Sequence, residues 1–366
     1  MSDSADRPGV HELTVLDVVE QTADACSISF AIPDDAAEAF EYRPGQFLTL
    51  AVPSDQTGVA ARCYSLSSSP ESGEPPTITV KRTVDGYASN WLCDNLRPGD
   101  TIRVLPPEGI FTPKTLEHDL LLFAGGSGVT PIISIARNAL KLGDRKIVVI
   151  YANRDEKSVI FANEWSELAR TYPERLQVVH WLESVQGLPT ADQLRAFAAA
   201  HRSYEAFVCG PAEYMKMVMT ALRELEFPRE RRHQEKFVSL GGNPFGDELA
   251  EAQAAAEIAE AEADEDDAAP VGPAGPVTLE VELDGEQHSF NDWDPKTTLL
   301  EHLESKGIKA PFSCRAGECS ACAIRLVEGE VRMDNNDVLD AEDLDEGIRL
   351  GCQSHPMTEK VSVSYS

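Results

Sequence analysis

The stretch Cys314-Arg-Ala-Gly-Glu-Cys319-Ser-Ala-Cys322 places three cysteines in one short loop, and Cys352 follows after 29 intervening residues. Four thiolates with this C-x4-C-x2-C…C spacing can hold a [2Fe–2S] cluster. Gly317 and its small neighbours suit a loop that wraps closely around a cluster and donates backbone N–H groups to its sulfurs. Structural zinc sites more often have two short Cys/His pairs. The spacing therefore favours an iron–sulfur cluster over zinc or four unrelated thiols, and these four cysteines are the predicted metal ligands.

The 366 residues of the chain leave room for two or three domains with proper hydrophobic cores. The other cysteines, Cys26, Cys63, Cys93 and Cys209, are scattered, which argues against a disulfide framework. The N-terminal residues lack the apolar core of a secretory signal, and no run of about 18 apolar residues exists. We therefore expect a soluble, cytoplasmic protein without a membrane span.

The formal net charge of −30 is unevenly distributed, and residues 241–275 hold ten acidic and no basic residues. This strongly negative charge argues against nucleic-acid binding, because a protein binds the phosphate backbone through a positively charged surface. The acidic residues after 275 have two open explanations. They increase solubility, or they steer the cluster-bearing region toward a basic patch on a redox partner.

Three patterns of secondary structure follow one another along the chain. Short strands separated by Pro and Gly turns over 11–110 predict an antiparallel β-barrel. Alternating strands and helices over 119–225 predict a parallel sheet with helices on both faces. From Val277 onward, a hairpin and a helix before the cysteine loop predict a small α+β unit.

The segment Arg62-Cys-Tyr64-Ser65 ends one of the barrel strands and has the chemistry that a flavin needs. Arg pairs with a pyrophosphate oxygen, Tyr packs against an isoalloxazine ring, and Ser donates a hydrogen bond near the reactive flavin nitrogen. Further along, Gly86 and Ser89 lead into a short helix whose N-terminus could take the second phosphate. An ordinary helix cap explains that segment equally well.

The segment Gly125-Gly-Ser-Gly128-Val-Thr130-Pro follows a buried apolar strand and opens a helix. A glycine-rich turn in this context is typical of a phosphate cradle. Cys209-Gly-Pro ends the last strand of the same sheet, so it is expected at the carboxyl edge where ligands bind. The alternative for Cys209 is a buried small hydrophobic residue.

Taken together, these motifs resemble the ferredoxin–NADP reductase superfamily with a plant-type ferredoxin appended at the C-terminus. The resemblance covers nearly the whole chain except the acidic segment and the first few residues. The module order is similar to that of oxygenase reductases, and it looks closest to reductase components of 3-ketosteroid 9α-hydroxylases. It implies a FAD-binding β-barrel (1–115), an NAD(P)H-binding α/β domain (116–240) and a β-grasp [2Fe–2S] ferredoxin domain (276–366). The composition of 241–275, rich in Ala, Glu and Asp, separately predicts an acidic flexible linker.

The resemblance also assigns residues. Those implied to bind FAD are Arg62, Tyr64, Ser65, Lys81, Gly86 and Ser89. Those implied to bind the nicotinamide nucleotide are Gly126, Gly128, Thr130, Cys209, Gly210 and Pro211. Ser65, Cys209 and Glu235 are the implied catalytic set, with Phe237 covering the flavin ring, although the residues after Phe237 depart from the most common family ending. The resemblance favours NADH, while Arg154, placed to hold a 2′-phosphate, keeps NADPH open.

The implied function is an NAD(P)H-dependent reductase that passes electrons through FAD and the [2Fe–2S] cluster to a terminal oxygenase. The favoured partner is a Rieske oxygenase that acts on a 3-ketosteroid. One alternative is the reductase subunit of a di-iron oxygenase such as phenylacetyl-CoA epoxidase. A non-enzymatic alternative is a redox sensor that holds flavin and cluster without turnover.

Overall fold

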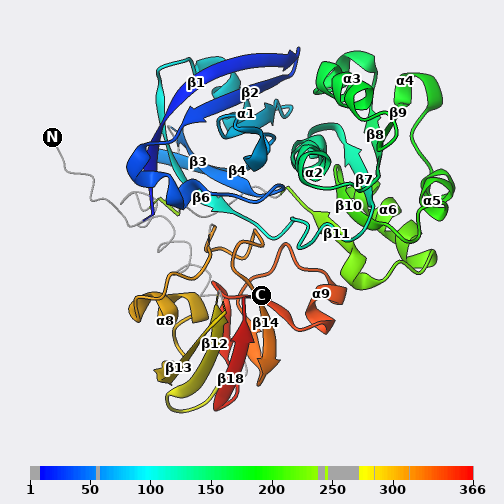
Figure 1. Cartoon of the computed structure of the whole chain (residues 1–366). Coiled ribbons are helices and arrows are strands. Elements are labelled where there is room, and N and C mark those ends of the chain that lie inside the picture. The colour runs from blue at the N-terminus through cyan, green and yellow to red at the C-terminus, as the bar shows by residue number, and fades with distance from the viewer. Residues whose placement is uncertain are drawn as a thin grey trace. The chain divides into compact units, whose positions relative to one another are not determined.

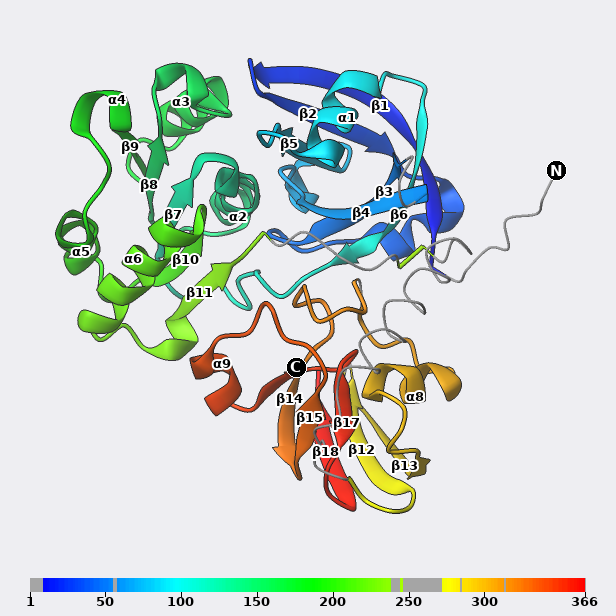
Figure 2. The same ribbon diagram turned by 180° about the vertical axis from the view of Figure 1, so that it is seen from behind.

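The computed structural model describes residues 9–54, 58–237, 244–245, 272–283, 285–312 and 314–365 (Figures 1 and 2). Its described residues form two compact units, one with 9–50 and 63–237, and the other with 51–62 and the residues from 244 onward. Most of the predicted linker, 241–275, lies outside the described residues and stays a prediction. No helix in the described part of the chain is long and apolar enough to cross a membrane.

The first sheet is antiparallel and confirms the predicted barrel. Its strand order is β4-β3-β6-β1-β2-β5. The strands are β1 (His11–Thr22), β2 (Ala25–Ala31), β3 (Phe47–Ser54), β4 (Gly58–Ser65), β5 (Thr77–Lys81) and β6 (Thr101–Glu108). A bridge between Leu66 and Ile78 joins the two outer strands and partly closes the barrel. Helix α1 (Tyr87–Asn95) lies between β5 and β6 in the chain.

The second sheet is fully parallel, as predicted from the alternation of strands and helices. Its strand order is β11-β10-β7-β8-β9. The strands are β7 (Leu120–Gly125), β8 (Ile147–Asn153), β9 (Leu176–Leu182), β10 (Glu205–Cys209) and β11 (Arg232–Glu235). Because side chains alternate along a strand, Leu120 and Leu122 face one hydrophobic core while Leu121 and Phe123 face another.

Helices cover both faces of this parallel sheet (Figure 1). Helices α2 (Val129–Leu142) and α3 (Ala162–Thr171) pack on the first core, and α5 (Ala191–Ala199) and α6 (Ala212–Glu224) pack on the second. A short helix, α4 (Glu183–Gln186), follows β9. Because all five strands run in the same direction, they end at the same carboxyl edge.

Helix α2 is also fixed to the barrel by buried and half-buried polar contacts. The Ser134 hydroxyl donates a hydrogen bond of 2.6 Å to the Ser68 carbonyl, and both side chains are buried. One turn further on, Arg137 Nη1 lies 3.4 Å from Glu74 Oε2. The helix that begins at the glycine-rich turn therefore rests directly on the loop that follows the predicted flavin motif.

The C-terminal part is a mixed sheet with the order β13-β12-β18-β14-β16, and a helix packs on it. Its elements are β12 (Val277–Leu283), β13 (Glu286–Trp293), α8 (Leu299–Ser305), β14 (Ala323–Glu328), α9 (Ala341–Asp345), β16 (Ile348–Leu350) and β18 (Lys360–Ser364), with a separate pair, β15 (Val331–Met333) and β17 (Ser354–Pro356). Thr298 and Glu301 form a capping box, so α8 begins at Leu299, slightly later than the apolar pattern suggests.

Candidate functional site

The carboxyl edge of the parallel sheet brings together residues that are far apart in the chain. In the register of the strands, Cys209 pairs with Ala124 on one side and with Glu235 on the other. Gly125 pairs with Ala152 on the next strand. The glycine-rich turn, the Cys-Gly-Pro segment and Glu235 therefore lie side by side at the edge where parallel sheets bind ligands.

The glycine-rich turn packs so closely on the Cys209-Gly-Pro segment that side chains are excluded. A Cβ on Gly128 would lie 2.3 Å from the carbonyl oxygen of Cys209. A Cβ on Gly125 would lie 2.7 Å from Cδ of Pro211. Gly126 has a φ of +52°, which is strained for other residues. Thr130 Oγ1 then donates to the Ser127 carbonyl at 3.1 Å as α2 begins.

The three residues predicted to be catalytic converge at this edge. Cys209 is fully buried, Ser65 is 3% exposed and Glu235 is 9% exposed. Neither Ser65 Oγ nor Glu235 Oε2 makes a hydrogen bond of normal geometry to a described residue. The Ser65 hydroxyl is nevertheless near enough to lower the pKa of Glu235, while the stronger effect of burial raises that pKa to about 8. Ser65 Oγ and Glu235 Oε2 are therefore two neighbouring buried polar atoms without a hydrogen bond of normal geometry among the described residues, which suits a polar ligand between barrel and sheet.

Burial also controls the chemistry of Cys209. Desolvation, with a smaller contribution from the Glu235 carboxylate, raises the pKa of the Cys209 thiol well above its ordinary value. The residue therefore stays a neutral thiol at physiological pH. A neutral, apolar side chain is suited to line a hydride path, whereas a thiolate nucleophile would need a lowered pKa.

The barrel presents the residues of the flavin motif on β4. Arg62 and Tyr64 are half-buried and point to the same side because they are two residues apart on a strand. Ser65 points to the other side and is buried. Gly86 precedes the first residue of α1, and the Ser89 hydroxyl accepts a hydrogen bond of 3.0 Å from the Thr83 N–H. Ser89 therefore stabilises the turn into α1.

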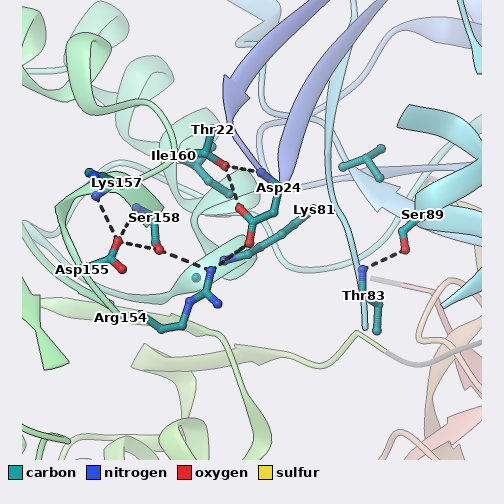
Figure 3. Close-up of polar contacts among 12 residues, drawn as sticks. Thr22, Asp24, Lys81, Thr83, Ser89, Arg154, Asp155, Lys157, Ser158 and Ile160 are labelled. Atoms are coloured by element: carbon teal, nitrogen blue, oxygen red, sulfur yellow. Dashed lines mark hydrogen bonds and ion pairs between the residues drawn. The ribbon is translucent and has the colours of Figure 1, made fainter. Parts of the chain in front are cut away.

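Lys81 and Arg154 lie close to one carboxylate that the sequence motifs do not reveal (Figure 3). Asp24 Oδ2 is 2.9 Å from Arg154 Nη2 and 3.8 Å from Lys81 Nζ. Asp24 lies between β1 and β2 on the barrel, whereas Arg154 follows β8 of the parallel sheet. No spacing rule links residues 130 positions apart, so only the packing of the two parts identifies this contact.

Phe237, the residue predicted to cover the flavin ring, lies two positions beyond the end of β11 and is 51% exposed. An aromatic side chain of this size is costly to leave in water. Its position just after Glu235 places it at the carboxyl edge of the sheet, on the side where β11 ends.

The four cysteines predicted to bind metal come together in the C-terminal part, and each is at most 7% exposed. The Cys314 thiol interacts with those of Cys319 and Cys352, and the Cys352 thiol also interacts with that of Cys322. Hydrogen bonds from Cys319 and Cys352, together with the N–H groups of neighbouring residues, lower the pKa of Cys314. The same contacts raise the pKa of the Cys352 thiol, so the thiols titrate together, and iron would bind them as thiolates.

Backbone geometry in this loop fits a cluster. The N–H groups of Ala316 and Glu318 both donate to Cys314 Sγ at 3.4 Å. Gly317 has a φ of +75°, and a Cβ there would lie 2.6 Å from the carbonyl oxygen of Asn335. Asn335 and Gln353 hold the loop from outside by donating to the Ala316 and Arg315 carbonyls, each at 2.7 Å. These two supports carry no spacing signal in the sequence.

The arrangement of the four thiols is compatible with a dinuclear centre. A [2Fe–2S] cluster spreads four thiolates over two irons, so each iron needs only two protein ligands. Four buried thiols that neighbour one another, with two N–H groups directed at Cys314 Sγ, suit that requirement.

Comparisons with known proteins identify three kinds of domain along the chain. Three family models match: an oxidoreductase FAD-binding domain over residues 12–112, an oxidoreductase NAD-binding domain over 122–220, and a 2Fe-2S iron-sulfur cluster binding domain over 281–357. The solved structure of phthalate dioxygenase reductase is 22% identical with a TM-score of 0.57, covering 97% of this chain and 98% of that one. At this identity the likeness concerns the fold alone.

Two curated relatives span the same length. The ferredoxin reductase component of 3-ketosteroid-9-alpha-monooxygenase from Rhodococcus rhodochrous is 55% identical over 353 residues, covering 96% of each chain. A 1,2-phenylacetyl-CoA epoxidase subunit from Escherichia coli is 30% identical over 370 residues, covering 97% of each chain. The names of both relatives describe parts of enzymes that add oxygen to an organic substrate.

Proposed function

The chain belongs to the family of 3-ketosteroid-9-alpha-monooxygenase ferredoxin reductase components, and from that premise we propose that it delivers electrons to a Rieske oxygenase acting on a 3-ketosteroid. It is an oxidoreductase with FAD-binding, NAD-binding and [2Fe–2S]-binding domains, and it serves as the reductase component of an oxygenase. We propose three further points: that the oxygenase acts on a steroid, that it is of the Rieske type, and that the protein is cytoplasmic.

The observation that carries the proposal is the convergence of Ser65, Cys209 and Glu235 in one buried site between a flavin-type barrel and a nucleotide-type sheet. FAD, when bound, takes a hydride from a nicotinamide and releases single electrons, which a [2Fe–2S] cluster accepts one at a time. Because a redox sensor does not need such a hydride path, the site favours a reductase that oxidises NAD(P)H catalytically.

We assign the residues the following roles. Ser65 donates a hydrogen bond to the flavin, because its buried hydroxyl has no other acceptor of normal geometry among the described residues. Glu235, with a pKa raised to about 8, is a neutral acid at pH 7 and places no negative charge beside the hydride acceptor. Cys209 excludes water from the path because it is fully buried and neutral.

The remaining predicted residues hold the ligands in place. Arg62, Lys81 and the start of α1 at Gly86 and Ser89 would bind the charged half of FAD, and Tyr64 would pack on its ring. The turn of Gly126, Gly128 and Thr130, facing Gly210 and Pro211, would cradle the nucleotide phosphates. Phe237 would cover the ring from the carboxyl edge. Cys314, Cys319, Cys322 and Cys352 would hold the cluster.

An anaerobic titration of the purified protein with NADH, followed by absorbance and low-temperature EPR, tests the proposal. Bleaching of the flavin together with a rhombic signal from a reduced [2Fe–2S] centre is the expected result. Bleaching without that signal would contradict the assignment of the cysteine loop. Failure of both NADH and NADPH to reduce flavin or any one-electron dye would favour the sensor.

A second step identifies the oxygenase class. The reduced protein is mixed with a purified Rieske ketosteroid oxygenase and, separately, with a di-iron oxygenase, and reoxidation of the cluster is followed by stopped flow. Faster reoxidation by the Rieske enzyme supports the proposal. A preference for the di-iron enzyme would favour a role like that of the epoxidase relative.

A further inference from the structure

The antiparallel barrel contains a pair of cysteines that the proposed function does not use. Cys26 lies on β2, and Cys93 lies on α1, which runs beside that strand (Figure 1). The Cys26 thiol donates a hydrogen bond of 3.0 Å to Cys93 Sγ. The two residues are 67 positions apart, so the fold, and not the spacing of the cysteines, reveals the pair. A disulfide has an S–S bond of about 2.05 Å, so the two sulfurs are roughly 1 Å short of bonding distance.

Surrounding contacts direct both sulfurs to the same point of the barrel. In the register of β2 and β5, Cys26 pairs with Val80. Cys93 Sγ lies 3.9 Å from the carbonyl oxygen of the same Val80. Arg82, which directly follows β5, holds α1 through Asp94, whose Oδ1 accepts a hydrogen bond of 2.7 Å from Arg82 Nη2. The approach of the two thiols is therefore built into the packing of α1 on β2 and β5.

The two thiols differ in access and in acidity. Cys93 is half-buried, whereas Cys26 is 7% exposed. The hydrogen bond from Cys26 and the charge of Arg82 lower the pKa of Cys93, although burial and the Asp94 carboxylate act in the opposite direction. The hydrogen bond to Cys93 and burial raise the pKa of Cys26. An accessible thiol of lowered pKa beside a buried neutral thiol is the arrangement of an attacking and a resolving cysteine.

We propose that Cys26 and Cys93 form a redox-active dithiol that hydrogen peroxide oxidises to a disulfide, which reversibly links α1 to β2. The Cys93 thiolate attacks one peroxide oxygen, the O–O bond breaks, and the departing hydroxide takes up a proton to become water. Cys93 is then a sulfenic acid. The Cys26 sulfur attacks the Cys93 sulfur, the S–O bond breaks, and the Cys26 proton leaves with the hydroxide as a second water. The two thiols lose two electrons, and these electrons reduce one peroxide to two waters.

The setting of the pair fits this chemistry. Flavins take part in O2 chemistry, of which hydrogen peroxide is a product, so a FAD-binding domain is exposed to this oxidant. In a reducing compartment such disulfides are usually transient and redox-sensing, which fits a bond that a dithiol reverses. The bond would hold α1 on the barrel, and the first turn of α1 contains Ser89, which is predicted to bind FAD. The inference depends on neither the substrate nor the type of the oxygenase.

The test treats the full chain, loaded with FAD and cluster, with hydrogen peroxide. Free thiols are then blocked with iodoacetamide, and the digested protein is mapped by mass spectrometry without reduction. We expect a peptide pair joined through Cys26 and Cys93, which dithiothreitol separates into two thiol peptides. Cys63, a half-buried cysteine on β4 of the same barrel, is the internal control and should not enter a joined peptide.

Two single variants test the order of attack. Cys26→Ser keeps a hydroxyl that can donate to Cys93 but removes the resolving thiol, so dimedone should trap the sulfenic acid at Cys93. Cys93→Ser leaves only the buried Cys26, and its labelling should be at least about tenfold weaker. A wild-type map without the Cys26–Cys93 peptide, or with Cys93 joined to Cys63, would overturn the inference. Equal dimedone labelling in the two variants would overturn the assigned roles.

Discussion

Replacing Glu235 by Gln should change how the stability of the protein depends on pH. Glu235 lies at the end of β11, is 9% exposed, and has an Oε2 without a hydrogen-bond partner among the described residues. Burial raises its pKa from 4.5 to about 8. Gln has nearly the same shape but never ionises, so the variant removes the titration and keeps the packing.

The magnitude follows from linkage between protonation and folding. The folded state binds the proton more tightly, so the free energy of unfolding is highest below pH 4.5 and falls as the pH rises to about 8. At about 1.36 kcal/mol for each pKa unit, that interval corresponds to at most about 5 kcal/mol. Glu108 also has a pKa raised to about 8 by burial. It is present in both proteins, so the difference between them isolates Glu235.

Urea unfolding at pH 5, 7 and 9, monitored by tryptophan fluorescence, measures the difference. At pH 5 the two proteins should be nearly equal in stability, with the Gln variant slightly favoured, because both folded side chains are neutral but the unfolded Glu235 is already partly ionised. At pH 9 the Gln variant should be more stable by several kcal/mol. The exposed Glu213 provides the control, since Glu213→Gln should behave as wild type at every pH. A stability difference that stays constant from pH 5 to 9 would refute the reasoning.

Two further substitutions test the two ends of the electron path. Gly128→Ala places a Cβ 2.3 Å from the Cys209 carbonyl and should lower kcat/KM for NADH at least about tenfold by displacing the turn, with the cluster spectrum intact. Gly275→Ala, which meets no atom within 4 Å, should leave both unchanged, and normal turnover in Gly128→Ala would be evidence against the cradle. Cys314→Ser should abolish the cluster EPR signal while NADH still bleaches the flavin, whereas Cys93→Ser should keep the signal. A surviving signal in Cys314→Ser would remove that residue from the ligand set.

Local patterns in the sequence predict most of this fold. The alternation in β1 and the apolar run of β7 before the glycines each predict a structure from a few neighbouring residues. The C-x4-C-x2-C spacing of Cys314, Cys319 and Cys322 does the same for the cluster loop. Two features of the site are not local. The approach of Ser65 to Glu235 and the Asp24–Arg154 pair depend on how the barrel packs against the parallel sheet.

The residues that support the cysteine loop could not be predicted either, because they too act through contacts between distant parts of the sequence. Asn335 and Gln353 hold the cysteine loop through hydrogen bonds to backbone carbonyls. Any polar side chain of suitable length could make such bonds, so their residue types carry little information. Cysteine, by contrast, is the residue type that binds an iron–sulfur cluster, so the spacing of the cysteines predicts the cluster from the sequence alone.

The contact between α2 and the barrel limits how this reductase can be recombined with its relatives. The buried Ser134–Ser68 bond and the Arg137–Glu74 pair both cross from the nucleotide part to the loop after β4. A chimaera that exchanged only the nucleotide part would place a foreign helix on this loop and would also lose the match between Asp24 and Arg154. Barrel and parallel sheet should therefore be exchanged together, because each contributes residues to these contacts.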